Sequence, residues 1–219
     1  MGAYAYDIIM DHNNIMDGCA IVEVGSNNIG PGGEGSSVFF AGFVLNKPNT
    51  TFYTIDIEES TQGGLDRFQR MMPDRYHVLT GDAVDMLDQV KEPIAFAYLD
   101  NFDYIPPGYE DADWMVQMIE NYRQRGVELT NANSAAAHLA QTQKVVDKAA
   151  DRCVILFDDT WDIATGRTFA GAVNPGTDVD GWYGKGATAV PWLLERGWRV
   201  LPKYEDPRPR DDWTALCNW

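Results

Sequence analysis

The alternation of short apolar runs with helix-like segments most constrains how this chain can fold. Five runs are largely apolar, β-branched or aromatic, as strands are: 19–24, 51–56, 76–82, 94–100 and 153–159. Segments with a helical pattern lie between or after them: 35–45, 61–72, 83–90, 111–126, 133–152 and 187–198. A sixth strand at 198–204 and a last one in WTALCNW bring the count to seven. Continuously apolar strands separated by helices predict a Rossmann-like α/β fold, a doubly wound and mostly parallel seven-stranded sheet with helices on both faces.

The sequence predicts one domain over residues 1–219, because it has neither an internal repeat nor a low-complexity linker. The stretch 104–150 departs from simple alternation, since two helices follow each other between the fourth and fifth strands. This is one helix more than a doubly wound unit needs. We expect a helical insertion that forms a lid or a substrate wall at the carboxyl edge of the sheet.

The formal net charge of -16 disfavours partners that are themselves anionic. Phosphate backbones and acidic lipid surfaces are repelled, so we expect neither a nucleic acid nor a membrane as partner. No run of 18 apolar residues occurs, and the N-terminus lacks a basic start before a long apolar stretch. The three cysteines are far apart and contain no CxxC pair, which favours a reducing, cytoplasmic location.

Acidic residues stand at the ends of four of the expected strands. They are Asp56, Asp82, Asp100 and the adjacent pair Asp158 and Asp159. Because the carboxyl ends of parallel strands meet at one edge, where ligands bind, we expect these side chains to share a site. Acids also cap helices, which is the alternative explanation for any one of them. Two neighbouring carboxylates after a buried strand repel each other unless a cation or a hydrogen-bond network satisfies them.

The first strand leads into a glycine-rich loop, VEVGSNNIGPGGEGSS, and then into a helix. Glycines let the backbone approach a ligand, and the helix start offers free N–H groups. Gly30, Gly32 and Gly35 match the GxGxxG pattern of dinucleotide-binding proteins, but they lie far from Gly25, which weakens a nicotinamide interpretation. Asp56, at the end of the second strand, is suited to bind a ribose diol.

In order and spacing, the motifs VEVG, GEGSS, YTIDIEES, LTGDAVDML, AYLDNFDY and ILFDDTW resemble class I S-adenosylmethionine-dependent methyltransferases. The most similar branch is the metal-dependent small-molecule O-methyltransferases, which includes catechol and macrolide-sugar O-methyltransferase-like enzymes. The resemblance covers residues 18–160, with 104–150 poorly matched. It implies a small hydroxylated acceptor, and it leaves a homo-oligomer open because several relatives assemble.

The resemblance also implies roles for individual residues. Glu23 and Gly25 would lie under the methionine part of the cofactor, and Ser36 or Ser37 would hold its carboxylate. Asp56 would bind the ribose, while Asp82 and Ala83 would border the adenine. Asp100 at the fourth strand would ligate a metal together with Asp158 and Asp159. Three carboxylates form an all-oxygen ligand set that suits Mg²⁺.

The general base is where the sequence departs from the catechol branch. That branch has a lysine shortly after the aspartate of the fourth strand, and this chain has Asp103 there. Asp103 and His138, the latter on the second helix of the insertion, are the candidate bases. Lys185, which lies between two glycines near a helix start, could meet an anionic group of the substrate or balance local acidic residues, and we leave it unassigned. A nicotinamide-dependent oxidoreductase and a non-catalytic cofactor-binding protein of the same fold remain alternatives.

Overall fold

The computed structural model describes residues 8–26, 35–59, 63–106, 108–162, 181–201 and 213–219. The elements before the insertion are η1 (Asn13–Ile15), β1 (Ala20–Val24), α2 (Ser36–Leu45), β2 (Thr51–Asp56), α3 (Asp66–Met71), β3 (Tyr76–Thr80), α4 (Ala83–Leu87) and β4 (Ile94–Leu99). The later elements are α5 (Asp113–Gln124), α6 (Asn131–Asp147), β5 (Ala149–Asp158), β6 (Thr160–Asp162), β7 (Trp182–Gly184), α7 (Ala189–Leu194), β8 (Arg199–Val200) and β9 (Trp213–Cys217).

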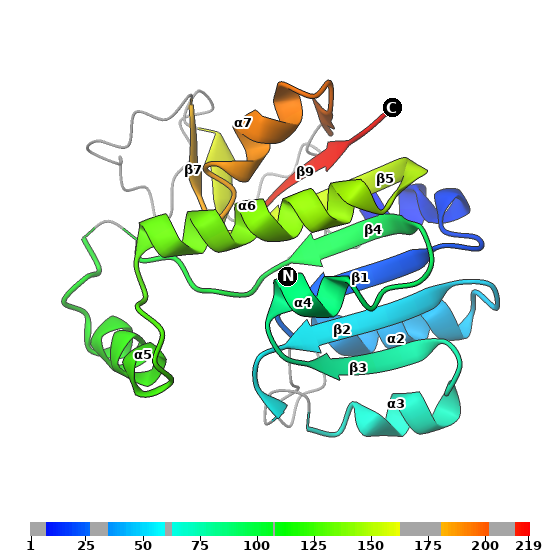
Figure 1. Ribbon diagram of the computed structural model, residues 1–219, viewed down its shortest axis with the longest axis horizontal. Helices are drawn as coiled ribbons and strands as arrows, with labels where there is room; N and C mark the ends of the chain where they lie inside the picture. Colours follow the sequence, from blue (N-terminus) through cyan, green and yellow to red (C-terminus); the bar gives the residue numbers. More distant parts are fainter. Residues whose placement is uncertain (1–7, 27–34, 60–62, 107, 163–180, 202–212) are drawn as a thin grey trace.

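Seven strands form one sheet in the order β3-β2-β1-β4-β5-β9-β8 (Figure 1). The pairs from β3 to β5 are parallel, and β9 is antiparallel to both β5 and β8. The chain order reverses between β1 and β4, which is the topological switch point of the sheet. In open α/β sheets, ligands bind beside the carboxyl ends of the strands at this point.

Helices cover the two faces of the sheet and bury a separate apolar cluster on each. Figure 1 shows α6 running across one face and α2 lying behind β2 on the other. Phe40 of α2 packs on its face with Phe52 and Phe96 from the sheet. The opposite cluster joins Val24 of β1 to Val145 of α6, together with residues of α4 and α7. The strands are therefore buried from both sides, as their unbroken apolar runs predict.

The predicted doubly wound, mostly parallel sheet is confirmed, but several boundaries differ. The segment 149–152, expected to end a helix, instead begins β5, where Ala149 pairs with Ile94 of β4. Pairing with a neighbouring strand here overrides the helical preference of the alanines. The small sheet of β6 and β7 was not predicted. Of the sixth strand, only Arg199–Val200 is formed, and 202–204 lie outside the described residues.

Candidate active site

The carboxyl ends of β1 and β4 approach each other closely at Gly25. The N–H of Gly25 donates to Ile55 O at 2.9 Å, and the N–H of Asp100 donates to Val24 O at 2.8 Å. Gly25 has φ = 94°, and a Cβ placed on it would lie 2.7 Å from backbone atoms of Asp100 and Asn101. Only glycine combines this backbone conformation with so close an approach. The residue therefore holds the two strand ends together at the switch point.

Glu23 lies fully buried just before this turn. Its Oε2 accepts hydrogen bonds from Ser37 Oγ at 2.5 Å and from Thr54 Oγ1 at 2.7 Å. Its Oε1 has no hydrogen-bond partner among the described residues. Burial raises the pKa of Glu23 to about 7, although the hydroxyl hydrogen bonds oppose this shift. A buried carboxyl group whose second oxygen lacks a partner is suited to hold a proton or to meet a polar ligand group.

The raised pKa of Glu23 predicts a pH-dependent stability. The folded protein binds this proton up to about pH 7, whereas the unfolded carboxyl group releases it near 4.5. Stability should therefore fall as the pH rises through this window, by about 3 kcal/mol in all. Glu23→Gln should remove this loss, so its free energy of unfolding relative to wild type should increase between pH 4 and pH 8. Denaturant titrations of the ligand-free protein at both pH values measure the difference. The exposed Glu128→Gln is the control, and an equal pH dependence in wild type and Glu23→Gln would contradict the prediction.

The serines expected at the cofactor carboxylate are both buried at the start of α2. Ser37 Oγ donates to Glu23, itself a predicted cofactor residue, and neither serine is among the residues described as lining the cleft. The glycine-rich residues 27–34 between them and β1 lie outside the described residues.

A cleft of about 680 Å³ opens at the carboxyl ends of the first four strands. The predicted residues Gly25, Asp56, Asp82, Ala83 and Asp100 all line it. Asp56 Oδ1 accepts from the N–H of Glu58, and Asp82 caps α4 by accepting from the N–H of Val84, both at 2.9 Å. Asp82 therefore caps a helix, which was the alternative explanation for the acidic residues, and it also lines the cleft.

The helical insertion contributes one wall of this cleft. Tyr122 of α5 and Arg125 just after it line the cleft, as do Ala137 and Gln141 of α6. Arg125 Nε forms a 2.5 Å ion pair with Glu58, which follows β2. The end of α5 is thereby tied to the segment that follows β2, and the role of the insertion as a substrate wall stays a prediction.

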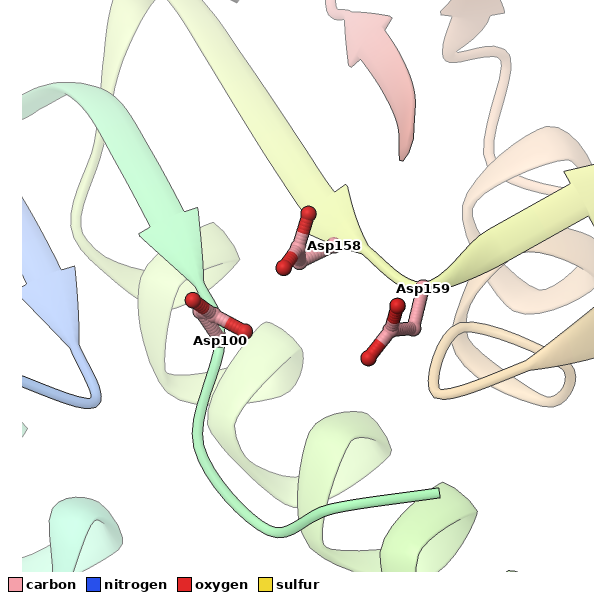
Figure 2. Close-up of side chains that lie close together, drawn as sticks. All are labelled: Asp100, Asp158 and Asp159. Atoms are coloured by element: carbon pink, nitrogen blue, oxygen red, sulfur yellow. The ribbon is translucent and has the colours of Figure 1, made fainter. Parts of the chain in front are cut away.

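Three carboxylates converge beside the cleft. Figure 2 shows Asp100 at the end of β4 facing Asp158 and Asp159 at the end of β5. One oxygen from each lies within 4.8 Å of the others, so the expected convergence is confirmed. Asp159 adopts φ = 42°, a conformation that is costly for a non-glycine residue. The strained backbone turns the second aspartate back toward the cluster, where three hard oxygen donors fit a divalent cation such as Mg²⁺.

Lys185 also belongs to this cluster, and the sequence did not reveal it. Its Nζ lies 2.7 Å from Asp100 Oδ1 and 3.1 Å from Asp159 Oδ2. The side chain is only 2% exposed. The N–H of Lys185 also donates to Asp159 O at 2.9 Å, which anchors the end of β7 to the end of β5. The available signal was the lysine between two glycines, which allow its backbone to approach β5 closely.

The charges within the cluster are strongly interdependent. Burial raises the pKa of Asp158 well above its usual value, and the neighbouring Asp100 carboxylate adds to this. Partial burial opposes the ionisation of Asp100, but Lys185 and hydrogen bonds from Asp158 and Tyr98 outweigh it and lower its pKa below the usual value. The Tyr98 hydroxyl donates to Asp100 Oδ2 at 2.8 Å. Within the cluster, Asp158 therefore binds a proton more readily than Asp100 does.

The two candidate bases occupy different environments. Asp103 lines the cleft and accepts a hydrogen bond from the Tyr122 hydroxyl at 3.0 Å. His138 is fully buried in α6, outside the set of residues that line the cleft. Its Nδ1 donates to Ser134 O at 2.8 Å, and burial lowers the pKa of its imidazole to about 4. The imidazole is neutral, and its Nε2 has no partner among the described residues.

Comparisons with known proteins identify the fold. No family model and no curated protein matches the sequence. Among solved structures, a Streptococcus mutans protein assigned as a methyltransferase, in complex with SAH (S-adenosylhomocysteine), aligns over 99% of this chain and 97% of its own, with 10% identity and a TM-score of 0.54. The chain therefore has the Rossmann-like fold of class I methyltransferases.

Two further structures align less closely. The ribosomal protein L11 methylase of Lactobacillus delbrueckii subsp. bulgaricus is 8% identical, with a TM-score of 0.47 over 99% of this chain and 79% of its own. An rRNA methylase of Streptococcus thermophilus is 12% identical, with a TM-score of 0.46 over 96% and 93%.

Proposed function

We propose that this chain is an S-adenosylmethionine-dependent O-methyltransferase that acts on a small hydroxylated molecule, with a divalent cation holding the acceptor oxygens. One observation carries the proposal: Asp100 both lines the cleft at the switch point and belongs to the carboxylate cluster. A donor in the cleft and an acceptor at the cluster would thus meet around one side chain. Methyl transfer depends chiefly on such alignment of nucleophile, carbon and leaving sulfur.

The acidic lining of the cleft supports this choice of cofactor. We propose that Asp56 binds the ribose hydroxyls and that Asp82 and Ala83, which follow β3, border the adenine; all three line the cleft. The carboxylates that line the cleft also attract the positive sulfonium centre of the donor. The SAH bound to the Streptococcus mutans protein of the same fold supports this choice of ligand.

The carboxylates of Asp100, Asp158 and Asp159 would hold Mg²⁺ or a similar ion. When bound, such an ion stabilises a developing alkoxide or phenolate. Asp103, which lies in the cleft beside Tyr122, can accept the hydroxyl proton directly. His138 offers a neutral Nε2 beneath the same edge, which would serve as a proton acceptor only if a path led to it from the cleft.

Asp56→Ala should lower the affinity for S-adenosylhomocysteine at least about tenfold, because a charge-assisted pair of hydrogen bonds to the ribose is lost. Isothermal titration calorimetry of the two proteins measures this effect. Asp74→Ala, which removes an exposed carboxylate outside the cleft, is the matched control and should bind as wild type does. Equal affinity in Asp56→Ala would exclude this residue from the site.

The alternatives predict different binding behaviour. An oxidoreductase would be stabilised against heat by NAD rather than by S-adenosylhomocysteine, and Asp56 would fit the ribose of either ligand. A non-catalytic protein of this fold would bind the cofactor without any effect of Mg²⁺. The lack of a GxGxxG pattern directly after β1 favours the methyltransferase over the oxidoreductase.

The net charge of the chain and the size of the cleft indicate which partners the protein can bind. We propose a small-molecule acceptor and no nucleic acid, since the chain carries a formal net charge of -16. Within the described residues, no helix is both long and apolar enough to cross a membrane.

A further inference from the structure

The carboxylate cluster already contains a cation that belongs to the chain. Lys185 Nζ contacts Asp100 Oδ1 and Asp159 Oδ2, which come from two of the three residues proposed to bind a divalent ion. The Lys185 side chain is only 2% exposed, and its contacts with these two carboxylates compensate an ammonium group that is held away from bulk water.

An ion bound by these carboxylates would bring a second positive charge next to the ammonium group. Mg²⁺ requires its oxygen ligands at about 2.0–2.1 Å. An ammonium 2.7 Å from Asp100 Oδ1 would then lie within a few ångströms of a doubly charged ion, where like charges repel strongly away from bulk water. We propose that Lys185 competes with the divalent cation for Asp100 and Asp159, so that the ion binds only when the ammonium group turns away. This inference rests on the proposed metal site.

The backbone around Lys185 restricts how it can leave. Its N–H is bonded to Asp159 O at 2.9 Å, and a Cβ on Gly184 would lie 1.9 Å from that same oxygen. The segment is thus packed against β5, and the displacement must be a rotation of the flexible lysine side chain. Asp103, three residues after Asp100, lines the same cleft as Asp100. Its carboxylate offers the displaced ammonium group a second partner.

In the metal-free protein the ammonium group offsets one negative charge of the cluster, and the need to displace it makes the ion bind less tightly than three free carboxylates would. Replacing Lys185 by methionine removes the competitor and keeps most of the side-chain volume. We expect Lys185→Met to bind Mn²⁺ at least about tenfold more tightly than wild type, since the fraction of molecules competent to bind rises. Electron paramagnetic resonance of free Mn²⁺, with the full chain and no cofactor, measures the affinity.

Lys144→Met is the matched control, because Lys144 pairs with Asp88 on the surface, away from the cluster. It should bind Mn²⁺ as wild type does. If wild type binds Mn²⁺ and Lys185→Met binds it no more tightly, the competition is refuted while the metal site stands. If none of the three proteins binds Mn²⁺ at millimolar concentration, both the competition and the metal part of the proposed function are refuted.

A second measurement covers the case in which Lys185→Met does not fold, since removing one partner of a buried ion pair is destabilising. In wild type, acetylation of each lysine can be followed by peptide mass spectrometry with and without saturating Mg²⁺. Lys185 should react slowly in the metal-free protein and several-fold faster with Mg²⁺, while Lys144 should not change. An unchanged rate at Lys185, with the site shown to be saturated, would overturn the inference.

Discussion

Asp158→Asn should abolish methyl transfer to any acceptor that wild type uses, and it should weaken divalent-cation binding at least about 100-fold. A neutral amide replaces one of three anionic ligands, and ligand charge dominates the affinity of hard cations for oxygen sites. The fold should persist, because the asparagine N–H₂ can still donate to Asp100, which is hydrogen-bonded to Asp158 in wild type. Calorimetric titration with Mg²⁺ measures the loss of cation affinity, and a thermal unfolding curve tests whether the fold persists.

The control for this variant is Asp85→Asn, an exposed change in the first turn of α4 that leaves the cluster intact. It should keep the Mg²⁺ affinity and the activity of wild type. Full turnover by Asp158→Asn would rule out a metal role for this residue, whatever its effect on stability.

Gly25→Ala should cost about 3 kcal/mol of stability or more, because two penalties act together. The φ of 94° is unfavourable for alanine, and the added Cβ would lie 2.7 Å from the backbone of Asp100 and Asn101. Backbone atoms cannot yield as the end of a side chain can, so β1 and β4 must separate. In a chain of this size, the melting temperature should fall by about 6–12 °C. Cofactor binding should also weaken, since these strand ends form the floor of the cleft.

Comparison with Gly18→Ala separates the cost of the backbone conformation from the cost of the close Cβ contact at Gly25. Gly18 has φ = 73°, but nothing lies within 4 Å of its would-be Cβ. We expect a loss of only about 1 kcal/mol from the backbone conformation alone. Differential scanning calorimetry of both variants measures the contrast, and equal losses would show that the close approach at Gly25 has no energetic consequence.

The fold was largely predictable because its signal is spread over many residues. The buried strands are continuous apolar runs, and both faces of a parallel sheet require such runs. Where a single local preference had to decide, prediction failed: the alanines at 149 and 150 favour a helix, yet they pair in β5. Pairing with β4 depends on residues distant in sequence, and no local pattern contains that information.

The candidate site also contains residues that could be predicted from the sequence and residues that could not. Asp56, Asp82 and Asp100 could be placed together because strand ends in a parallel sheet share one edge. Ser37 was expected beside the cofactor carboxylate, and the structure adds that its hydroxyl donates to the buried Glu23, a contact that the sequence did not indicate. Lys185 comes from a segment outside the main sheet, and its position depends on β7 packing against β6, a pairing that no sequence pattern revealed. Tertiary contacts, rather than residue type, decide these assignments.

The shared position of Asp100 has a thermodynamic consequence for the order of events at this site. A side chain that contributes to two neighbouring binding equilibria makes each ligand change the affinity for the other. By linkage, the factor by which an ion at the cluster alters cofactor affinity must equal the factor by which the cofactor alters ion affinity. Under the proposed function, the measured effect of the ion on cofactor affinity would therefore give the effect of the cofactor on ion affinity, with Asp100 as the side chain common to both.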